Sequence, residues 1–280
     1  MAFKILFVFM IGFVSSARAA TPVPMAFVTI PPGTFFMGSL ASEASRSNNE
    51  GPLHQVTLTQ PFEMQTSHVT QFQWAQLMGT NPSVIQKVFY CKTEWMTLNG
   101  IKLCPNNPVD SVSWFDAQLF IDKLNAVKDG FHYRLPTEAE FEYAARAGSQ
   151  TAYYFGDDPN QLRNNGWYYG NSIIQIATNP PRYAATTHRV GSKPANAFGL
   201  YDMSGNLWHW VQDYYANYSS SNAATNPSGP SSGSDRSTRG GSYLENASGC
   251  RSASRINDAF GGQEAWLDTG FRVVRNPVTE

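Results

Sequence analysis

Apolar and polar residues alternate over short distances in the N-terminal part of the chain, which predicts strands rather than helices. Residues 28–30 and 34–38 are two apolar or β-branched segments on either side of Pro31-Pro32-Gly33. Such a cluster is typical of a turn between two strands. Residues 54–58 alternate in the same way. We therefore predict three short strands, the first two of them arranged around a turn.

Three later segments carry helical patterns. Residues 70–78 have apolar side chains at helical spacing. Ser113 is followed three residues later by Asp116, and Thr137 by Glu140. This spacing is typical of a capping box, in which the first side chain accepts from the backbone of the third helical residue. Apolar stripes follow both pairs. The pattern predicts helices that begin after residues 70, 113 and 137.

The second half of the chain has little periodicity. Gly, Asn, Ser and aromatic residues dominate after residue 156, and residues 219–237 form a polar, low-complexity stretch that predicts a surface loop. The 280 residues are 42% hydrophobic and 15% charged, which is enough apolar surface for a sizeable core. No repeat or charged linker divides them. We expect one loop-rich α+β domain over residues 25–276.

The first nineteen residues have the pattern of a signal peptide. Lys4 precedes an apolar run over residues 5–14, and Ala17-Arg18-Ala19 matches a small-x-small cleavage site. A buried strand or a membrane anchor is the alternative. However, about ten apolar residues are too few to cross a bilayer, which needs about twenty. We expect cleavage after Ala19, export to the periplasm or medium, and no membrane attachment of the mature chain.

Charge and motifs exclude several classes of function. Twenty basic residues balance twenty-one acidic ones, for a net charge of -1, and no basic patch is visible, so we expect no nucleic-acid partner. The sequence has no Gly-x-Ser-x-Gly elbow, no closely spaced histidine pair and no phosphate-binding glycine loop. These absences argue against serine hydrolases, zinc hydrolases and nucleotide-dependent enzymes.

The three cysteines predict one disulfide. Cys91 and Cys104 flank a short segment containing the turn dipeptide Asn99-Gly100. Closing a loop of this size stabilises a protein by about 3 kcal/mol on the chain-entropy model. Cys250 is left unpaired. It is either a reactive thiol or a small buried hydrophobe, and the frequency of buried free cysteines favours the second.

Several motifs, taken in order, closely resemble the sulfatase-modifying-factor family of formylglycine-generating enzymes. They lie at residues 27–39 (FVTIPPGTFFMGS), 107–109 (NPV), 112–114 (VSW), 133–146 (YRLPTEAEFEYAAR), 196–208 (NAFGLYDMSGNLW), 239–243 (RGGSY) and 270–272 (GFR). The resemblance covers nearly the whole mature chain. It implies an α+β domain of the C-type-lectin-like kind. Active members oxidise a cysteine of a client sulfatase to formylglycine, using oxygen and copper.

The resemblance also implies a pair of catalytic cysteines, which this sequence does not fully retain. The first position is occupied by Glu245, and the second, counted without gaps, falls on Cys250. The stretch from Tyr243 to Arg255 is three residues shorter than in active members, so a gap before Cys250 would move it out of that position. A single thiolate is a poor Cu(I) site. The altered pair therefore argues against copper binding and against the oxidation of cysteine to formylglycine.

Other positions of the family persist. Ser242 and Trp208 match residues that line the pocket for oxygen and substrate, which makes them catalytic candidates beside Cys250 and Glu245. In the alternative interpretation, Ser242 only shapes a turn and Trp208 is a core anchor. Four arginines look like a structural framework that satisfies buried carbonyl groups. They are Arg134, Arg146, Arg239 and Arg272.

The resemblance further implies a calcium site. Asp202, Gly205 and Leu207 occupy its ligand positions, but His209 stands where a glutamate belongs. Imidazole nitrogen is a poor ligand for calcium, which prefers oxygen. We expect a weakened site. The alternative is that Asp202 and His209 only form hydrogen bonds in a turn.

Two classes of function remain open. The first is an exported oxidoreductase that modifies a peptide or protein client, through Cys250 or through the cysteine-independent oxidation of pyoverdine-maturation members of the same fold. The second is a non-catalytic module that binds a peptide or glycan in the former substrate groove. In either case we expect a monomer.

Overall fold

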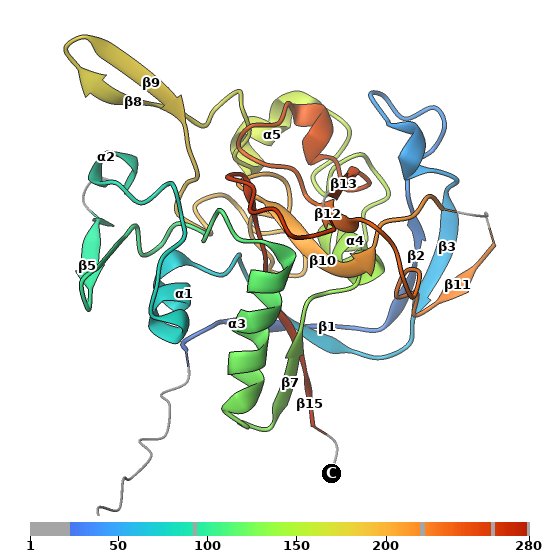
Figure 1. Cartoon of the computed structure of the whole chain (residues 1–280). Helices are drawn as coiled ribbons and strands as arrows, with labels where there is room; N and C mark the ends of the chain where they lie inside the picture. The colour runs from blue at the N-terminus through green and yellow to red at the C-terminus, as the bar shows by residue number, and fades with distance from the viewer. Residues whose placement is uncertain (1–22, 92–93, 219–221, 259–260, 279–280) are drawn as a thin grey trace, which may run out of the picture.

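Two four-stranded sheets form the centre of the computed structural model, which describes residues 23–91, 94–218, 222–258 and 261–278. The predicted signal peptide lies outside these residues. The first sheet is antiparallel and joins the beginning of the described chain to its end, in the order β1 (Phe27–Ile30), β4 (Phe62–Gln65), β15 (Val274–Pro277) and β7 (Phe131–Arg134). The second has the order β13 (Arg255–Asp258), β12 (Arg236–Arg239), β10 (Trp208–Tyr214) and β14 (Thr269–Gly270). Figure 1 shows long loops connecting these strands, which confirms the loop-rich α+β class.

The three predicted strands form, and the first two belong to different sheets. Strands β1 and β2 (Gly33–Met37) lie on either side of the Pro31-Pro32 turn, and β3 (His54–Leu58) follows. Instead of pairing with each other, β1 pairs with β4 and β2 with β3. Proline has no N–H to donate and a fixed φ, so the two prolines carry the chain from one sheet to the next.

Three smaller groups of strands lie outside the central sheets. The short strand β11 (Ala224–Thr225) adds to β3 and completes a three-stranded sheet with β2. Two hairpins are formed by β5 (Met96–Leu98) with β6 (Ile101–Leu103), and by β8 (Ile173–Thr178) with β9 (Pro181–Ala185). The β8–β9 hairpin extends away from the body of the molecule in Figure 1.

Two of the predicted helices begin after Ser113 and Thr137, as their capping pattern indicated, and all three predicted helices form. They are α1 (Gln71–Met78), α3 (Trp114–Ala126) and α4 (Glu138–Arg146). Each has a complete capping box, with Thr70, Ser113 and Thr137 as the N-cap residues. Shorter helical segments complete the list: α2 (Val88–Cys91), α5 (Leu162–Asn165) and the 3-10 turns η1 (Asn48–Glu50), η3 (Pro159–Gln161) and η4 (Ala247–Cys250). No helix among the described residues is both long and apolar enough to cross a membrane.

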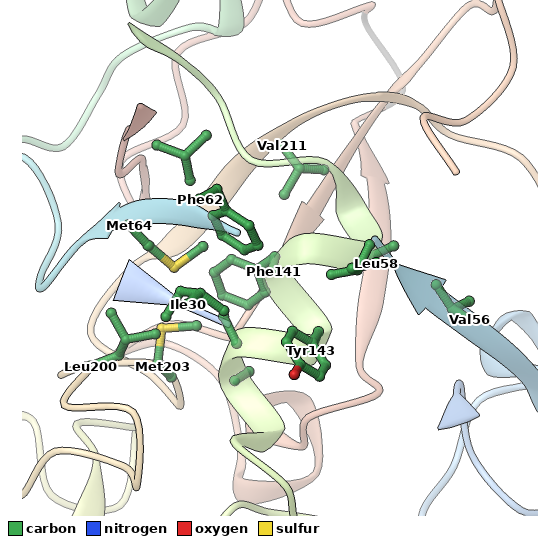
Figure 2. Close-up of a cluster of buried hydrophobic side chains, with 14 of the residues drawn as sticks. Ile30, Val56, Leu58, Phe62, Met64, Phe141, Tyr143, Leu200, Met203 and Val211 are labelled. Carbon is green, nitrogen blue, oxygen red and sulfur yellow. The ribbon is translucent and has the colours of Figure 1, made fainter. Parts of the chain in front are cut away.

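Helix α4 lies at the centre of one hydrophobic cluster. Phe141 projects from it between Ile30, Phe62 and Met64 of the first sheet (Figure 2). A second cluster packs α1 and α3 against that sheet through Trp74, Phe120 and Phe271, among other side chains. The amphipathic patterns in the sequence thus correspond to real core faces.

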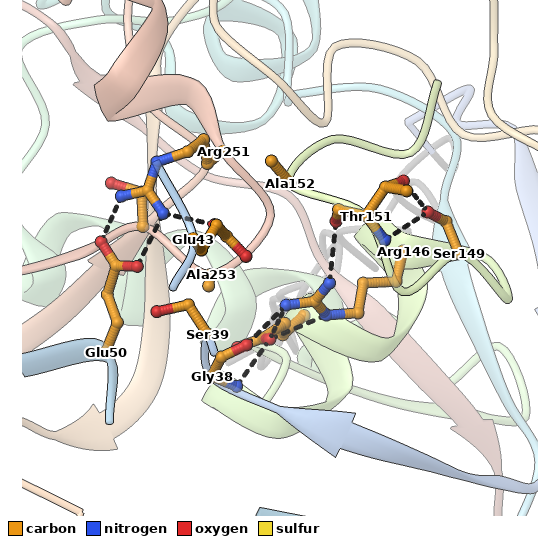
Figure 3. Close-up of polar contacts among 12 residues, drawn as sticks. Gly38, Ser39, Glu43, Glu50, Arg146, Ser149, Thr151, Ala152, Arg251 and Ala253 are labelled. Atoms are coloured by element: carbon orange, nitrogen blue, oxygen red, sulfur yellow. Dashed lines mark hydrogen bonds and ion pairs between the residues drawn. The ribbon is translucent and has the colours of Figure 1, made fainter. Parts of the chain in front are cut away.

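Arginine side chains connect α4 to the second sheet, in agreement with the predicted framework. Arg239 is fully buried, donates to the carbonyls of Ala253 at 2.8 Å and Ser254 at 2.7 Å, and pairs with Glu142. Arg146 donates to Gly38 O at 2.7 Å, and Arg251 pairs with Glu43 and Glu50 of the N-terminal loops; Figure 3 shows both groups of contacts. These contacts hold the loops that surround α4.

The polar stretch 219–237 is only partly a surface loop, which corrects the prediction. Residues 219–221 lie outside the described residues. Ala224 and Thr225 form β11, and the last two residues begin β12, where Arg236 and Ser237 are buried. Ser237 satisfies its buried hydroxyl by donating to Glu138 Oε2 at 3.2 Å. Backbone pairing and such polar contacts place these residues in sheets without an apolar pattern in the sequence.

The predicted disulfide joins Cys91 and Cys104, and Cys250 is free and buried, as expected. We therefore expect thiol titration of the folded, unreduced protein to detect no reactive thiol, and titration after denaturation to detect one. Three thiols after denaturation would contradict the disulfide, and fast labelling of the folded protein would contradict the burial of Cys250.

Replacing Asp213 with asparagine should stabilise the protein at neutral pH. Asp213 is almost fully buried, and burial together with the charges of Glu138 and Glu140 raises the pKa of its carboxyl from 3.8 to about 7. Because the raised pKa belongs to the folded state, stability is lost as pH rises from about 4 to about 7. In urea denaturation, Asp213→Asn should raise the free energy of unfolding by at most about 4 kcal/mol at pH 8 and should leave it unchanged at pH 4. A loss at pH 8 would contradict this.

Candidate functional site

The four predicted catalytic residues lie together at one end of the second sheet, where β10 begins and β12 ends. Trp208 begins β10, and the segment after β12 carries Ser242, Glu245 and Cys250 around a tight turn. The turn depends on Gly241, which has φ +75° and lies so close to η4 that a Cβ there would meet Cys250 Sγ at 2.7 Å. The sequence motif Gly-Gly-Ser therefore places Ser242 directly beside Cys250.

Cys250 is in an environment that keeps its thiol protonated. Its side chain is fully buried with Ala152, Tyr153 and Leu162, and its sulfur lies 4.0 Å from the carbonyl oxygen of Ser242. Burial, and then the negative charge of Glu245, raise the pKa of the thiol far above its usual value. Since the thiolate is the form that attacks and binds metals, this cysteine resembles a small core residue.

Glu245 faces the same turn from its solvent side. Its carboxylate lies against Gly249, where a Cβ would be 2.7 Å from Oε2. Partial burial and the nearby charge of Asp268 raise the pKa of Glu245, while the side chain of Trp208 lowers it by hydrogen bonding. Glu245 thus interacts with both Trp208 and Cys250.

Asp268 is a member of the site that sequence reasoning missed. Ser242 Oγ donates to Asp268 Oδ2 at 2.8 Å, and the Trp208 backbone N–H donates to its carbonyl at 2.9 Å. Burial raises the pKa of Asp268, and the Ser242 hydroxyl lowers it. The feature of the sequence that could have identified Asp268 is its position directly before the Thr-Gly-Phe-Arg segment, which contains a family motif. Two carboxylates, rather than two thiols, therefore dominate the chemistry of this site.

Exposed apolar side chains surround the two carboxylates. Leu244, next to Glu245, is 42% exposed, and Trp266 and Leu267, next to Asp268, are 45% and 46% exposed. The backbone N–H of Tyr169 donates to Glu245 O at 2.9 Å and brings another half-exposed ring to the same segment. Contiguous exposed apolar groups of this kind mark interaction surfaces.

The donor set does not fit the copper that the family resemblance implies. Linear Cu(I) coordination prefers two soft thiolates. Within the described chain, Cys250 is the single free thiol, and it is buried and protonated, while Glu245 offers hard oxygen atoms.

The positions of the expected calcium ligands are largely occupied by protein contacts. The Leu207 carbonyl accepts from His68 Nε2 at 3.0 Å, and His209 Nε2 accepts from Arg272 Nε at 3.0 Å. Asp202 Oδ2 accepts from the Gly191 N–H at 2.8 Å, as the hydrogen-bonding alternative predicts. Gly205 has φ +94° and donates its N–H to Gly240 O.

The charges near Asp202 also disfavour calcium. Its second oxygen, Oδ1, has no hydrogen-bond partner among the described residues, but the buried Arg272 guanidinium already acts on this carboxylate. Burial raises the pKa of Asp202 to about 6. With an imidazole in place of the glutamate and a fixed cation nearby, these residues do not fit a calcium ion.

A family model of the sulfatase-modifying factor enzyme 1-like domain matches residues 14–277. The chain belongs to this family. The match begins inside the predicted signal peptide and otherwise covers the expected domain. It agrees with the ordered motifs, most of which lie in or beside the central sheets.

Two formylglycine-generating enzymes illustrate the relationship. The enzyme of Thermomonospora curvata is 30% identical, over 93% of this chain and 97% of its own length. That of Streptomyces coelicolor is 29% identical, over 84% of this chain and 86% of its own. Among solved structures, Treponema denticola variable protein 1 aligns with a TM-score of 0.72 and 25% identity, over 90% of this chain and 95% of that one.

Proposed function

We propose that this sulfatase-modifying factor family protein is exported and holds a segment of a protein or peptide client at the surface around Glu245 and Asp268, without oxidising it through copper and cysteine. The family relationship supports a protein client, since the related enzymes act on sulfatases. The signal-peptide pattern supports export, and N-terminal sequencing of the exported protein should begin at Ala20. We expect a monomer.

The observation that carries the proposal is the state of the cysteine position. The Cys250 thiol is buried, protonated and alone, and the neighbouring position holds Glu245. A thiol in this state neither attacks nor holds Cu(I) well. The protein therefore does not offer the pair of thiolates that holds copper in active members.

The composition of the surface supports binding. Leu244, Trp266 and Leu267 expose apolar area on both sides of the two carboxylates. Neither Glu245 nor Asp268 takes part in an ion pair within the described residues, whereas most buried glutamates are paired with arginine. Aromatic and aliphatic anchors beside carboxylates that lack an ion-pair partner suit a peptide with apolar side chains and N–H donors.

Selection of random displayed peptides against the immobilised protein tests the proposal. We expect enriched peptides whose affinity falls at least about tenfold on the double variant Trp266→Ser, Leu267→Ser, the equivalent of about 1.4 kcal/mol. The matched control is Leu119→Ser, since Leu119 is an exposed leucine on α3. No enrichment, or equal binding to the double variant, would contradict the proposal.

The oxidoreductase interpretation remains a prediction, and the mass of a bound peptide tests it. A bound peptide recovered with an altered mass after incubation in air would support cysteine-independent oxidation. An unchanged mass would support binding alone.

A further inference from the structure

A cavity of about 520 Å³ lies between α4 and the β3–β11 strand pair and shares no residue with the Glu245 site. Its volume is in the range of sites for small molecules. Apolar groups form much of its wall: Met37, Ala139, Ala224, Pro227, Pro230 and the rings of Tyr214 and Tyr218. Such walls suit the carbon skeleton of an organic ligand.

One carboxylate on this wall has no cationic partner. Asp213 Oδ2 accepts from the Glu138 backbone N–H at 2.9 Å. The other oxygen, Oδ1, faces Gly229, whose missing side chain leaves it uncovered, since a Cβ there would lie 2.9 Å from Oδ1. Glu138 also lines the cavity, but Arg239 and Arg255 pair with it. No ion pair involves Asp213 in the part of the chain that the structure describes.

The charged groups around Asp213 compensate its negative charge only in part. Glu138 and Glu140 of α4 raise its pKa, and Arg255 of β13 lowers it less. The Arg236 guanidinium also interacts with it, but lies between the rings of Trp114 and Tyr214. His54 and Tyr218 face the same cavity and pack edge to face at 4.7 Å.

We propose that this cavity binds a small organic primary amine, with its ammonium group on the Asp213 carboxylate and its carbon skeleton against Tyr214 and Tyr218. A bound ammonium supplies the counter-charge that the surrounding residues do not. Because Asp213 must be ionised to pair with it, affinity should fall as pH drops below about 7. At pH 8 an alkylamine remains protonated, as lysine does.

Isothermal titration at pH 8 with butylamine and 2-phenylethylamine, against butanol and 2-phenylethanol, tests the proposal. At least one amine should bind at least tenfold more tightly than its alcohol. Asp213→Asn should abolish this preference, while Asp122→Asn, an equal charge change on the exposed face of α3, should retain it. Asp213→Asn is expected to fold, since it removes a destabilising charge.

A second variant tests the cavity itself. Ser228 is exposed and lines the cavity, so Ser228→Trp should fill its entrance and reduce amine binding at least tenfold while leaving Asp213 unchanged. Absence of amine binding, equal binding of the alcohols, or a preference that survives Asp213→Asn would each overturn the proposal. Binding unaffected by Ser228→Trp would place the amine elsewhere and overturn it as well.

Discussion

Replacing Arg239 with alanine should lower the free energy of unfolding by about 3–5 kcal/mol, the usual cost of breaking a buried ion pair. The guanidinium is fully buried, pairs with Glu142 and lies 3.4 Å from Glu138. Without the guanidinium, the buried negative charges of the two glutamates are less compensated. The carbonyls of Ala253 and Ser254 also lose their hydrogen-bond donor. Urea denaturation measures the loss.

Arg134→Ala is the matched control. Arg134 pairs with Glu140 at 2.6 Å, but its side chain is 28% exposed, so its loss should cost only about 1 kcal/mol. The loss for Arg239→Lys should lie between those for Arg239→Ala and Arg134→Ala, because one ammonium group cannot bind Glu142 and both carbonyls together. Equal losses for Arg239→Ala and Arg134→Ala would contradict the importance of the buried network.

Glu245→Cys should raise the affinity for Cu(I) by a hundredfold or more, which corresponds to about 2.8 kcal/mol. The Glu245 side chain lies against Gly249 and interacts with Cys250, so a sulfur at this position would come near the existing thiol. Two soft ligands hold Cu(I) far better than one. Competition with a chromogenic Cu(I) chelator under reducing conditions measures the change.

The double variant Glu245→Cys, Cys250→Ser is the control and should return to the weak affinity of the unchanged protein. If Glu245→Cys alone does not raise the affinity for Cu(I), Cys250 does not occupy the second cysteine position. The three-residue gap relative to active members then lies before Cys250.

The sequence predicted local structure better than pairing between distant segments. Capping residues act within one helical turn, so Ser113 and Thr137 were sufficient to locate the starts of two helices, and apolar spacing over residues 70–78 located the third. The pairing of β1 with β4, and of β15 with β4 and β7, joins segments far apart in the chain, and the local pattern does not predict it. The β8–β9 hairpin was not predicted, because its exposed strands carry no strong alternation.

The site was predictable to the extent that its residues share one motif. Ser242, Glu245 and Cys250 lie within nine residues, and their proximity follows from the chain itself. Asp268 reaches them only through the pairing of β14 with β10. Asp213 and its cavity could not be predicted, because six separate segments form the walls.

The central claim is that the site lacks copper-dependent cysteine oxidation, and one measurement tests it most directly. A peptide containing Cys-x-Pro-x-Arg is incubated in air with the copper-treated protein and weighed by mass spectrometry, with the formylglycine-generating enzyme of Thermomonospora curvata as the positive control. Conversion of the thiol to the aldehyde removes about 18 Da, a value fixed by the chemistry of cysteine. We predict an unchanged peptide mass with this protein, and conversion at a rate comparable to the control would contradict the account.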